Sequence, residues 1–227
     1  MDNEAAFFNR KGLWGIAMRV RSIAAIFAVL GVAAYFNAAS AHQDHQADQA
    51  PRGPFSLVDH TGREVSDEDY RGKYMLIAFG YIYCPDTCPT MLQTMGDALD
   101  ILGRAGEKVQ PIFITLDPER DTPELLAQYV AAFHPRLVGL SGTPARIAAA
   151  VKTYHVRFMK FFNPLFDKSR EQDGVNFEYL LDHTSLIYLM GPDGRGLSVI
   201  DYGVSAEDLA ARIGQFMDVP PSPEPSQ

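Results

Sequence analysis

Residues 81–89 read YIYCPDTCP and hold both cysteines of the 227-residue chain, Cys84 and Cys88. The preceding residues, 74–83, form an apolar run with strand composition, and apolar residues recur at helical spacing in the following residues, 91–102. The two thiols are therefore predicted to lie at a strand-to-helix junction. This junction decides the fold, because the rest of the chain can be interpreted as a scaffold around it.

Backbone N–H groups at a helix start favour the thiolate, which is the form of cysteine that attacks disulfides and binds metals. We therefore expect at least one reactive cysteine. If Cys84 and Cys88 occupy helical positions i and i+4, their Cα atoms lie roughly 6 Å apart, within the range of about 4.4 to 6.8 Å that a disulfide tolerates. The pair could close as a disulfide or hold a metal. A purely structural bridge is disfavoured, because closing so short a loop removes little unfolded-state entropy.

The composition suits one ordinary domain plus a targeting segment, since 47% of the residues are hydrophobic. The formal net charge is -8 at pH 7. A chain of this charge lacks the basic stripe that neutralises phosphates, so we expect no nucleic-acid partner.

Residues 1–41 have the pattern of an N-terminal export signal or membrane anchor. Basic residues within 10–21 precede an apolar run at 23–36, and the small residues Ala-Ser-Ala follow at 39–41. The uncharged window at 22–41 just reaches the roughly 20 residues that span a bilayer, so cleavage and retention as an anchor both stay open. The positive charges lie before the apolar run, which predicts a periplasm-facing domain, anchored in the inner membrane or released after cleavage.

The remaining residues divide into a polar linker at 42–54, one domain at 55–219 and a proline-rich, disordered tail at 220–227. The domain opens with an expected β-hairpin over 55–65. Strands and helices then alternate, which is typical of an α/β sheet flanked by helices. The expected strands cover 109–116, 156–162, 186–190 and 197–202, and the expected helices cover 122–133, 143–155 and 205–217.

Three blocks of sequence in register resemble one family. They are CPDTCP at 84–89, TLDPERDT at 115–122, and DHT at 182–184, followed by GPDG at 191–194. In order and spacing they resemble the Sco/SenC family of copper-handling proteins, over about residues 55–217. The resemblance implies a thioredoxin-like fold with a central mixed sheet. It also implies a role in building the dinuclear copper site of cytochrome c oxidase, whose copper-site subunit is then the expected partner.

The resemblance further implies that Cys84, Cys88 and His183 bind copper. Two thiolates and an imidazole form a soft donor set that suits Cu(I), and the nitrogen with an added oxygen lets Cu(II) be held as well. A closed structural zinc site takes four protein ligands, one more than this set of three offers, so copper fits better than zinc. Asp86 could be a further oxygen ligand or a charge that favours a helix N-terminus. His183 is expected at the head of the strand at 186–190.

Asp117, Arg120 and Asp121 follow the strand at 109–116 and leave two interpretations open. The resemblance suggests a charge cluster that shapes the loop beside the copper site. A capped, salt-bridged loop without a role at the site fits the same residues.

Three hypotheses from different classes follow for the function. The first is a copper-binding assembly factor that needs His183. The second is a thiol-disulfide oxidoreductase, in which Cys84 or Cys88 attacks a partner disulfide and the other cysteine resolves it. The third is a thiol peroxidase that passes through a sulfenic acid. Proline after each cysteine and the lack of an arginine within the cysteine loop argue against the third, although Arg120 could approach in space.

The first two hypotheses are linked by redox chemistry. In an oxidising compartment the two cysteines tend to form a disulfide, which cannot offer two thiolates to a metal. Copper loading then requires a reductant, and we expect a second thioredoxin-like protein as that partner.

Overall fold

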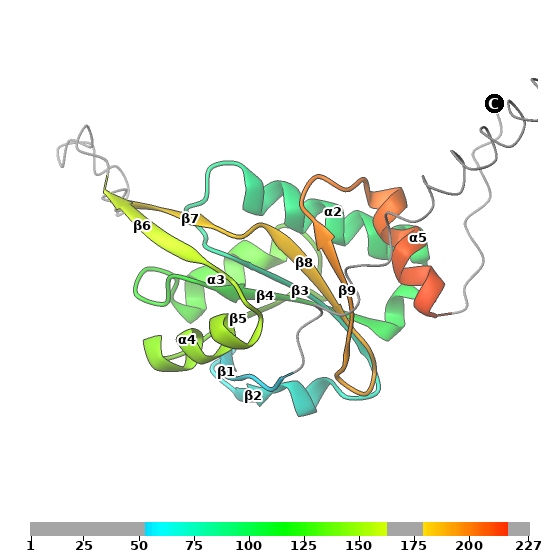
Figure 1. The fold of residues 1–227 in the computed structure, drawn as a ribbon, viewed down its shortest axis with the longest axis horizontal. Coiled ribbons are helices and arrows are strands. Elements are labelled where there is room, and N and C mark those ends of the chain that lie inside the picture. The colour runs from blue at the N-terminus through cyan, green and yellow to red at the C-terminus, as the bar shows by residue number, and fades with distance from the viewer. Residues whose placement is uncertain (1–52, 163–178, 218–227) are drawn as a thin grey trace, which may run out of the picture. The chain divides into compact units, whose positions relative to one another are not determined.

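The computed structural model describes residues 53–162 and 179–217 (Figure 1). The predicted N-terminal signal or anchor, nearly all of the linker and the C-terminal tail lie outside these residues and stay predictions. Within the described ranges, no helix has the length and apolar character needed to cross a membrane.

A mixed seven-stranded sheet forms the centre of the domain, in the order β2-β1-β5-β4-β3-β8-β9. Strands β3, β4 and β5 run parallel to one another, and the other neighbours pair antiparallel. The expected α/β class and N-terminal hairpin are confirmed. The strands of this sheet are β1 (Ser56–Asp59), β2 (Glu64–Ser66), β3 (Tyr74–Gly80), β4 (Val109–Thr115), β5 (Val138–Ser141), β8 (Leu186–Met190) and β9 (Gly196–Asp201).

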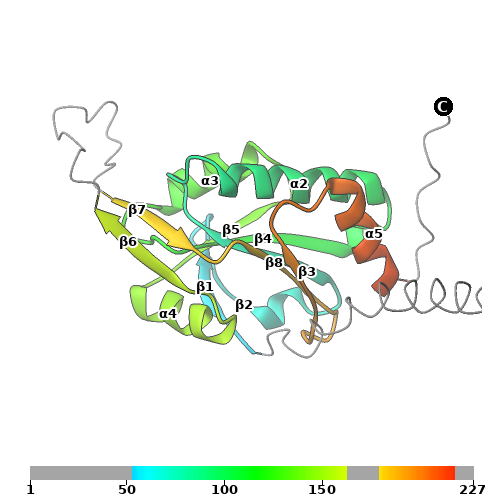
Figure 2. The same ribbon diagram turned by 45° about the horizontal axis from the view of Figure 1, so that its top comes forward.

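Helices cover both faces of the sheet (Figure 2). Three of the helices expected from sequence begin at a capping residue whose side chain accepts a backbone N–H, and two of these also carry proline at the first position, as predicted. The helices are α2 (Thr87–Leu102), α3 (Pro123–Ala131), α4 (Pro144–Thr153) and α5 (Ala206–Phe216), with short 3₁₀ turns η2 (Asp67–Tyr70) and η3 (Gly106–Lys108).

The alternation of side chains along β3 explains why both faces are covered. Met75, Ile77 and Phe79 join the core cluster that includes α4 residues, whereas Leu76 and Ala78 join the cluster formed with α2, α3 and α5. All five side chains are essentially inaccessible to solvent. A strand buried on both faces reads as a continuous apolar run, which is why this strand could be predicted from sequence.

A second, two-stranded sheet consists of β6 (Phe158–Phe162) and β7 (Tyr179–His183), paired antiparallel. Sequence analysis predicted β6 but did not predict β7. It also missed β5, whose four residues include a glycine and give too short a pattern to read. The β7 error matters because His183 is the last residue of that strand, not the head of β8 as expected.

Candidate metal and thiol site

The two cysteines lie at the strand-to-helix junction, as predicted, but only one of them is helical. Strand β3 ends at Gly80, and α2 begins at Thr87 with Asp86 as its N-cap residue. Cys88 is therefore the second residue of α2, whereas Cys84 lies in the loop before it. The condition that both cysteines are helical is therefore not met, because the residue before a proline is disfavoured in the α conformation and Pro85 follows Cys84.

The sulfur of Cys84 faces the start of the helix. Its Sγ atom accepts a hydrogen bond from the Cys88 backbone N–H at 3.4 Å and lies 3.3 Å from the Thr87 hydroxyl. These contacts place a negative sulfur at the positive end of α2. Cys84 is half-buried, whereas the Cys88 side chain is fully buried. The structure therefore gives one accessible and one protected thiol, and both are free cysteines.

Gly80 makes room for the buried sulfur. A Cβ atom at this position would lie 2.5 Å from the Cys88 Sγ atom and 2.9 Å from the Phe113 ring. Contacts that short do not occur in folded proteins, so any larger residue would displace the thiol or the end of the strand. Sequence analysis did not single out Gly80. The signal was a glycine that ends a buried strand four residues before Cys84, which marks close approach of another group.

His183 completes the site from β7. Its Nε2 atom lies 3.4 Å from the Cys88 Sγ atom, and its Nδ1 atom lies 3.1 Å from the Thr184 carbonyl oxygen. A carbonyl oxygen only accepts hydrogen bonds, so Nδ1 is the protonated nitrogen that donates to it. In the neutral imidazole, Nε2 then presents its lone pair toward the thiols, which is the tautomer that a metal requires.

Cys84, Cys88 and His183 together form a donor group. Their ligand atoms all lie within 4.8 Å of one another, close enough to hold one metal ion. Among the described residues Asp86 does not join this group: its side chain is exposed and makes no capping hydrogen bond to α2.

The pKa values of the two thiols shift in opposite directions. The Cys88 thiol lowers the pKa of Cys84 to about 3 against the desolvation that opposes it, with further help from His183, Thr87 and the Asp86 backbone. The same pairing, together with burial, raises the pKa of Cys88. Desolvation opposes charge on His183, but its hydrogen bond with Cys84 prevails and raises its pKa. The apo site thus concentrates negative charge on the accessible sulfur.

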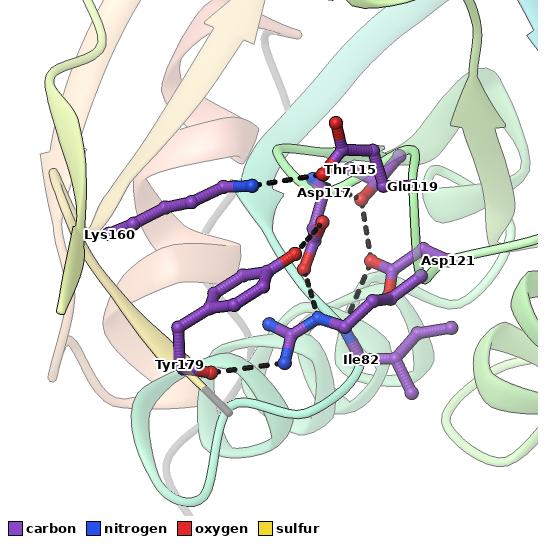
Figure 3. Close-up of polar contacts among 8 residues, drawn as sticks. Ile82, Thr115, Asp117, Glu119, Asp121, Lys160 and Tyr179 are labelled. Carbon is purple, nitrogen blue, oxygen red and sulfur yellow. Dashed lines mark hydrogen bonds and ion pairs between the residues drawn. The ribbon is translucent and has the colours of Figure 1, made fainter. Parts of the chain in front are cut away.

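The loop between β4 and α3 carries a network of buried polar contacts (Figure 3). The Arg120 guanidinium donates to the Asp117 carboxylate at 2.5 Å and to the Tyr179 carbonyl oxygen at 3.0 Å. The Tyr179 hydroxyl also donates to Asp117, at 2.8 Å. This network links the loop to the first residue of β7.

Asp121 links the same loop to the cysteine loop. Its carboxylate accepts the Thr115 hydroxyl at 2.5 Å and the Ile82 backbone N–H at 3.1 Å (Figure 3). Asp121 is fully buried, and this burial raises its pKa to about 7. The three charged residues left open by sequence analysis therefore form a salt-bridged loop that also touches both segments of the donor group.

The SCO1/SenC family model matches residues 43–218, which is most of the chain. The chain belongs to the SCO1/SenC family. This confirms the resemblance drawn from the three sequence blocks.

Two SCO1/SenC relatives and one solved structure give the extent of the similarity. Protein sco1 of Schizosaccharomyces pombe is 41% identical over 165 residues, which cover 72% of this chain and 60% of that protein. The human mitochondrial SCO1 homolog is 39% identical over 167 residues, covering 73% of this chain and 52% of that protein. The chain thus matches only about half to three-fifths of the length of these two relatives.

The solved structure is Bradyrhizobium japonicum ScoI with copper bound. It is 42% identical in sequence, superimposes with a TM-score of 0.64, and the match covers 74% of this chain and 99% of that chain. The thioredoxin-like fold expected for a SCO1/SenC protein is confirmed by this likeness and by the mixed sheet flanked by helices.

Proposed function

We propose that the chain is a copper-binding assembly protein for cytochrome c oxidase that holds one copper ion through Cys84, Cys88 and His183. The observation that carries this proposal is the convergence of the three ligand atoms within 4.8 Å, with the Nε2 atom of the histidine facing the sulfurs. Cys84 and Cys88 lie close together in the sequence, whereas His183 belongs to a strand of a separate sheet.

The donor set fits copper better than zinc. Two sulfurs and one imidazole are soft ligands that suit Cu(I), whereas a structural zinc site takes four protein ligands. The described residues bring together three. Copper binding also fits the low pKa of Cys84, because a metal binds the thiolate and a lowered pKa reduces the cost of deprotonation near neutral pH.

Family membership supports the same assignment, since SCO1/SenC proteins are linked to cytochrome c oxidase assembly and ScoI of Bradyrhizobium japonicum was solved with copper bound. In this proposal the copper is cargo. Donor groups of the recipient replace Cys84, Cys88 and His183 one at a time. A recipient thiol that enters releases a proton, each departing cysteine thiolate takes one up, and His183 leaves as the neutral imidazole. No electron moves in these exchanges, so the metal keeps its oxidation state. The recipient is the copper-site subunit of cytochrome c oxidase.

Two further parts of the proposal rest on sequence chemistry. The N-terminal residues, 1–41, export the domain and place it facing the periplasm, either anchored to the inner membrane or released by cleavage. In that compartment a thioredoxin-like reductant keeps Cys84 and Cys88 as thiols, because a disulfide cannot supply two thiolates to copper.

The test is a titration of the reduced full chain, purified in detergent, with Cu(I) and separately with Cu(II). One tight equivalent in the wild type, lost in Cys84→Ala and greatly weakened in His183→Ala, is the expected result. Equal copper affinity of His183→Ala and wild type would overturn the three-donor assignment.

A thiol-disulfide oxidoreductase is the second candidate, and one observation favours it. Cys84 combines a low pKa with partial exposure, and Cys88 is buried behind it, which is the arrangement of an attacking and a resolving cysteine. In such a reaction Cys84 forms a mixed disulfide, Cys88 releases it, and the chain's dithiol is oxidised as the partner is reduced. Insulin reduction that needs both cysteines but not His183, without tight copper binding, would favour this candidate.

The structure weakens one argument against the thiol peroxidase hypothesis, which was the lack of an arginine within the cysteine loop. Arg120 does approach the cysteine loop, with its guanidinium 5.2 Å from the centre of the Tyr83 ring. It is, however, engaged by Asp117 and the Tyr179 carbonyl. Rapid peroxide consumption that depends on Cys84 would be needed to support this activity.

A further inference from the structure

The position of His183 relative to the two cysteines depends on contacts outside the main sheet. The cysteines follow β3, which pairs with β4 and β8 in the seven-stranded sheet. His183 ends β7, and within the described residues the ladder partner of β7 is β6 alone. Among the described residues no strand of the main sheet pairs with β7, so its place against the cysteine loop also depends on side-chain and carbonyl contacts.

Arg120 makes the contacts that join the two parts. Its guanidinium donates to the Tyr179 carbonyl at the start of β7 and lies 3.7 Å from the centre of the Tyr179 ring. The same group lies 5.8 Å from the centre of the Tyr81 ring and 5.2 Å from that of Tyr83, both in the cysteine loop. The arginine thus lies among aromatic rings of both segments, where its planar fork can stack and donate at once.

Burial makes this contact effective. The Arg120 side chain is 10% exposed and the Asp117 side chain that orients it is 1% exposed. A charge pair shielded from water in this way is weakly screened and keeps a fixed geometry. An exposed arginine with several rotamers could not hold two segments in register in the same way.

Tyr81 connects Arg120 to the ligands, because it contacts both β7 and the cysteine loop. Its phenol oxygen interacts with the Leu181 backbone on β7, two residues before His183, and its ring packs edge-on against the imidazole with centroids 6.0 Å apart. Its carbonyl also accepts the Cys84 backbone N–H, at 3.3 Å. A displacement of Tyr81 therefore moves a sulfur donor and the imidazole relative to each other.

We propose that Arg120 is a positioning residue of the copper site, which holds strand β7 and its His183 in bonding reach of Cys84 and Cys88. The proposal rests on the proposed copper function for its affinity test, but the geometry that it assigns belongs to the apo chain as well. Arg120 acts on the ligands through Tyr179 and Tyr81.

The experiment compares Arg120→Gln, Arg120→Lys and a control, Arg71→Gln, in the full chain in detergent. Arg71 also pairs with a buried carboxylate, Asp67, but it precedes the opposite end of β3 from the cysteines. The first readout needs no copper: nuclear Overhauser contacts between the Tyr81 and His183 rings of the reduced apo chain. We expect these contacts in the wild type and in Arg71→Gln and their loss or marked weakening in Arg120→Gln.

The second readout is Cu(I) affinity by chelator competition, arranged as a double-mutant cycle with His183→Ala. Arg120→Gln should weaken Cu(I) binding by about tenfold or more, and Arg71→Gln by less than about twofold. In the His183→Ala background Arg120→Gln should change the affinity by less than about twofold, because there is no imidazole left to position. Arg120→Lys keeps the charge but not the planar guanidinium, so it should weaken Cu(I) binding by about threefold or more. This variant provides the test if Arg120→Gln does not fold.

The outcomes separate the two proposals. Ring contacts that persist in Arg120→Gln, or an equal loss of affinity with and without His183, would overturn the positioning role. A wild type that binds no copper would overturn the proposed function, and the ring contacts of the apo chain would then decide the positioning role alone.

Discussion

The Nε2 atom of His183 lies 3.4 Å from the Sγ atom of Cys88, although 95 residues separate them in the sequence. Strand β7 delivers the imidazole and helix α2 delivers the thiol, so the fold alone creates this contact. The neighbouring Cys84 sulfur makes the group a three-donor site.

The first prediction concerns the reactivity of the two thiols. The pKa of Cys84 is lowered to about 3 and that of Cys88 is raised, so at about pH 5 the folded apo chain carries a thiolate at Cys84 only. We expect iodoacetamide at this pH to modify Cys84 and spare Cys88, as read by peptide mass spectrometry.

The control for this labelling is the urea-unfolded chain, in which both thiols regain ordinary pKa values near 8.5 and should react slowly at about pH 5. Equal labelling of the two cysteines in the folded chain would contradict the assignment of charge to Cys84.

A second prediction concerns the space around the buried sulfur. Gly80→Ala places a Cβ atom 2.5 Å from the Cys88 Sγ atom, so the thiol must shift from its present position in the donor group. We expect a loss of Cu(I) affinity of about tenfold or more, together with destabilisation of about 1 to 3 kcal/mol from overpacking.

Gly142→Ala is the matched control, because its added Cβ would meet Leu57 at 3.3 Å, far less tightly, and away from the cysteines. Its copper affinity should equal that of the wild type. Unchanged Cu(I) affinity in Gly80→Ala would show that the Cys88 position is not critical.

A third prediction uses the pH dependence of stability. The pKa of Asp121 is about 7 in the folded chain, because burial raises it well above the unfolded value near 4. Between about pH 4 and pH 7 the folded state therefore binds more protons than the unfolded state, and this contribution to stability is lost as the pH rises, by up to about 1.4 kcal/mol per pH unit. Asp121→Asn removes it, so the stability of the variant relative to wild type should increase from pH 4 to pH 7 in urea denaturation.

The control is Asp193→Asn, at an exposed carboxylate whose pKa is lowered by hydrogen bonds from Arg195. A lowered pKa contributes stability that is present above the unfolded pKa, near 4, and is lost only in more acid solution, so the difference between this variant and wild type should stay nearly constant from about pH 5 to pH 7. A constant difference between Asp121→Asn and wild type across the window would refute the raised pKa.

A fourth prediction concerns the oxidised chain. If Cys84 and Cys88 are joined by a disulfide, His183 is the one ligand of the three that remains, and tight Cu(I) binding should be lost and return after reduction. Chelator competition before and after treatment with a thiol reductant measures this. One tight equivalent of Cu(I) bound by the oxidised chain would remove the need for the proposed reductant.

Much of this structure could be predicted from local sequence signals. Strand β3 could be predicted from its apolar run. Helices α3, α4 and α5 could be predicted from capping residues, whose side chains accept a backbone N–H at each helix start. The cysteine junction was predicted for the same reason, because Cys84 and Cys88 lie between a strong strand pattern and a strong helix pattern.

The rest depended on contacts that sequence spacing does not record. Strand β7 carries no apolar alternation strong enough to separate it from a loop, so the element that presents His183 was missed. The roles of Gly80 and Arg120 follow from packing with residues distant in sequence, Cys88 and Tyr179. The sequence motif singled out Arg120, but it could not show that this residue contacts strand β7.

The most direct test of the three-donor site is X-ray absorption of the reduced full chain loaded with one equivalent of Cu(I). The proposed site predicts two sulfur ligands and one imidazole nitrogen in the wild type, with the nitrogen lost in His183→Ala. A wild-type spectrum fitted by two sulfurs alone and unchanged by His183→Ala would contradict the central claim.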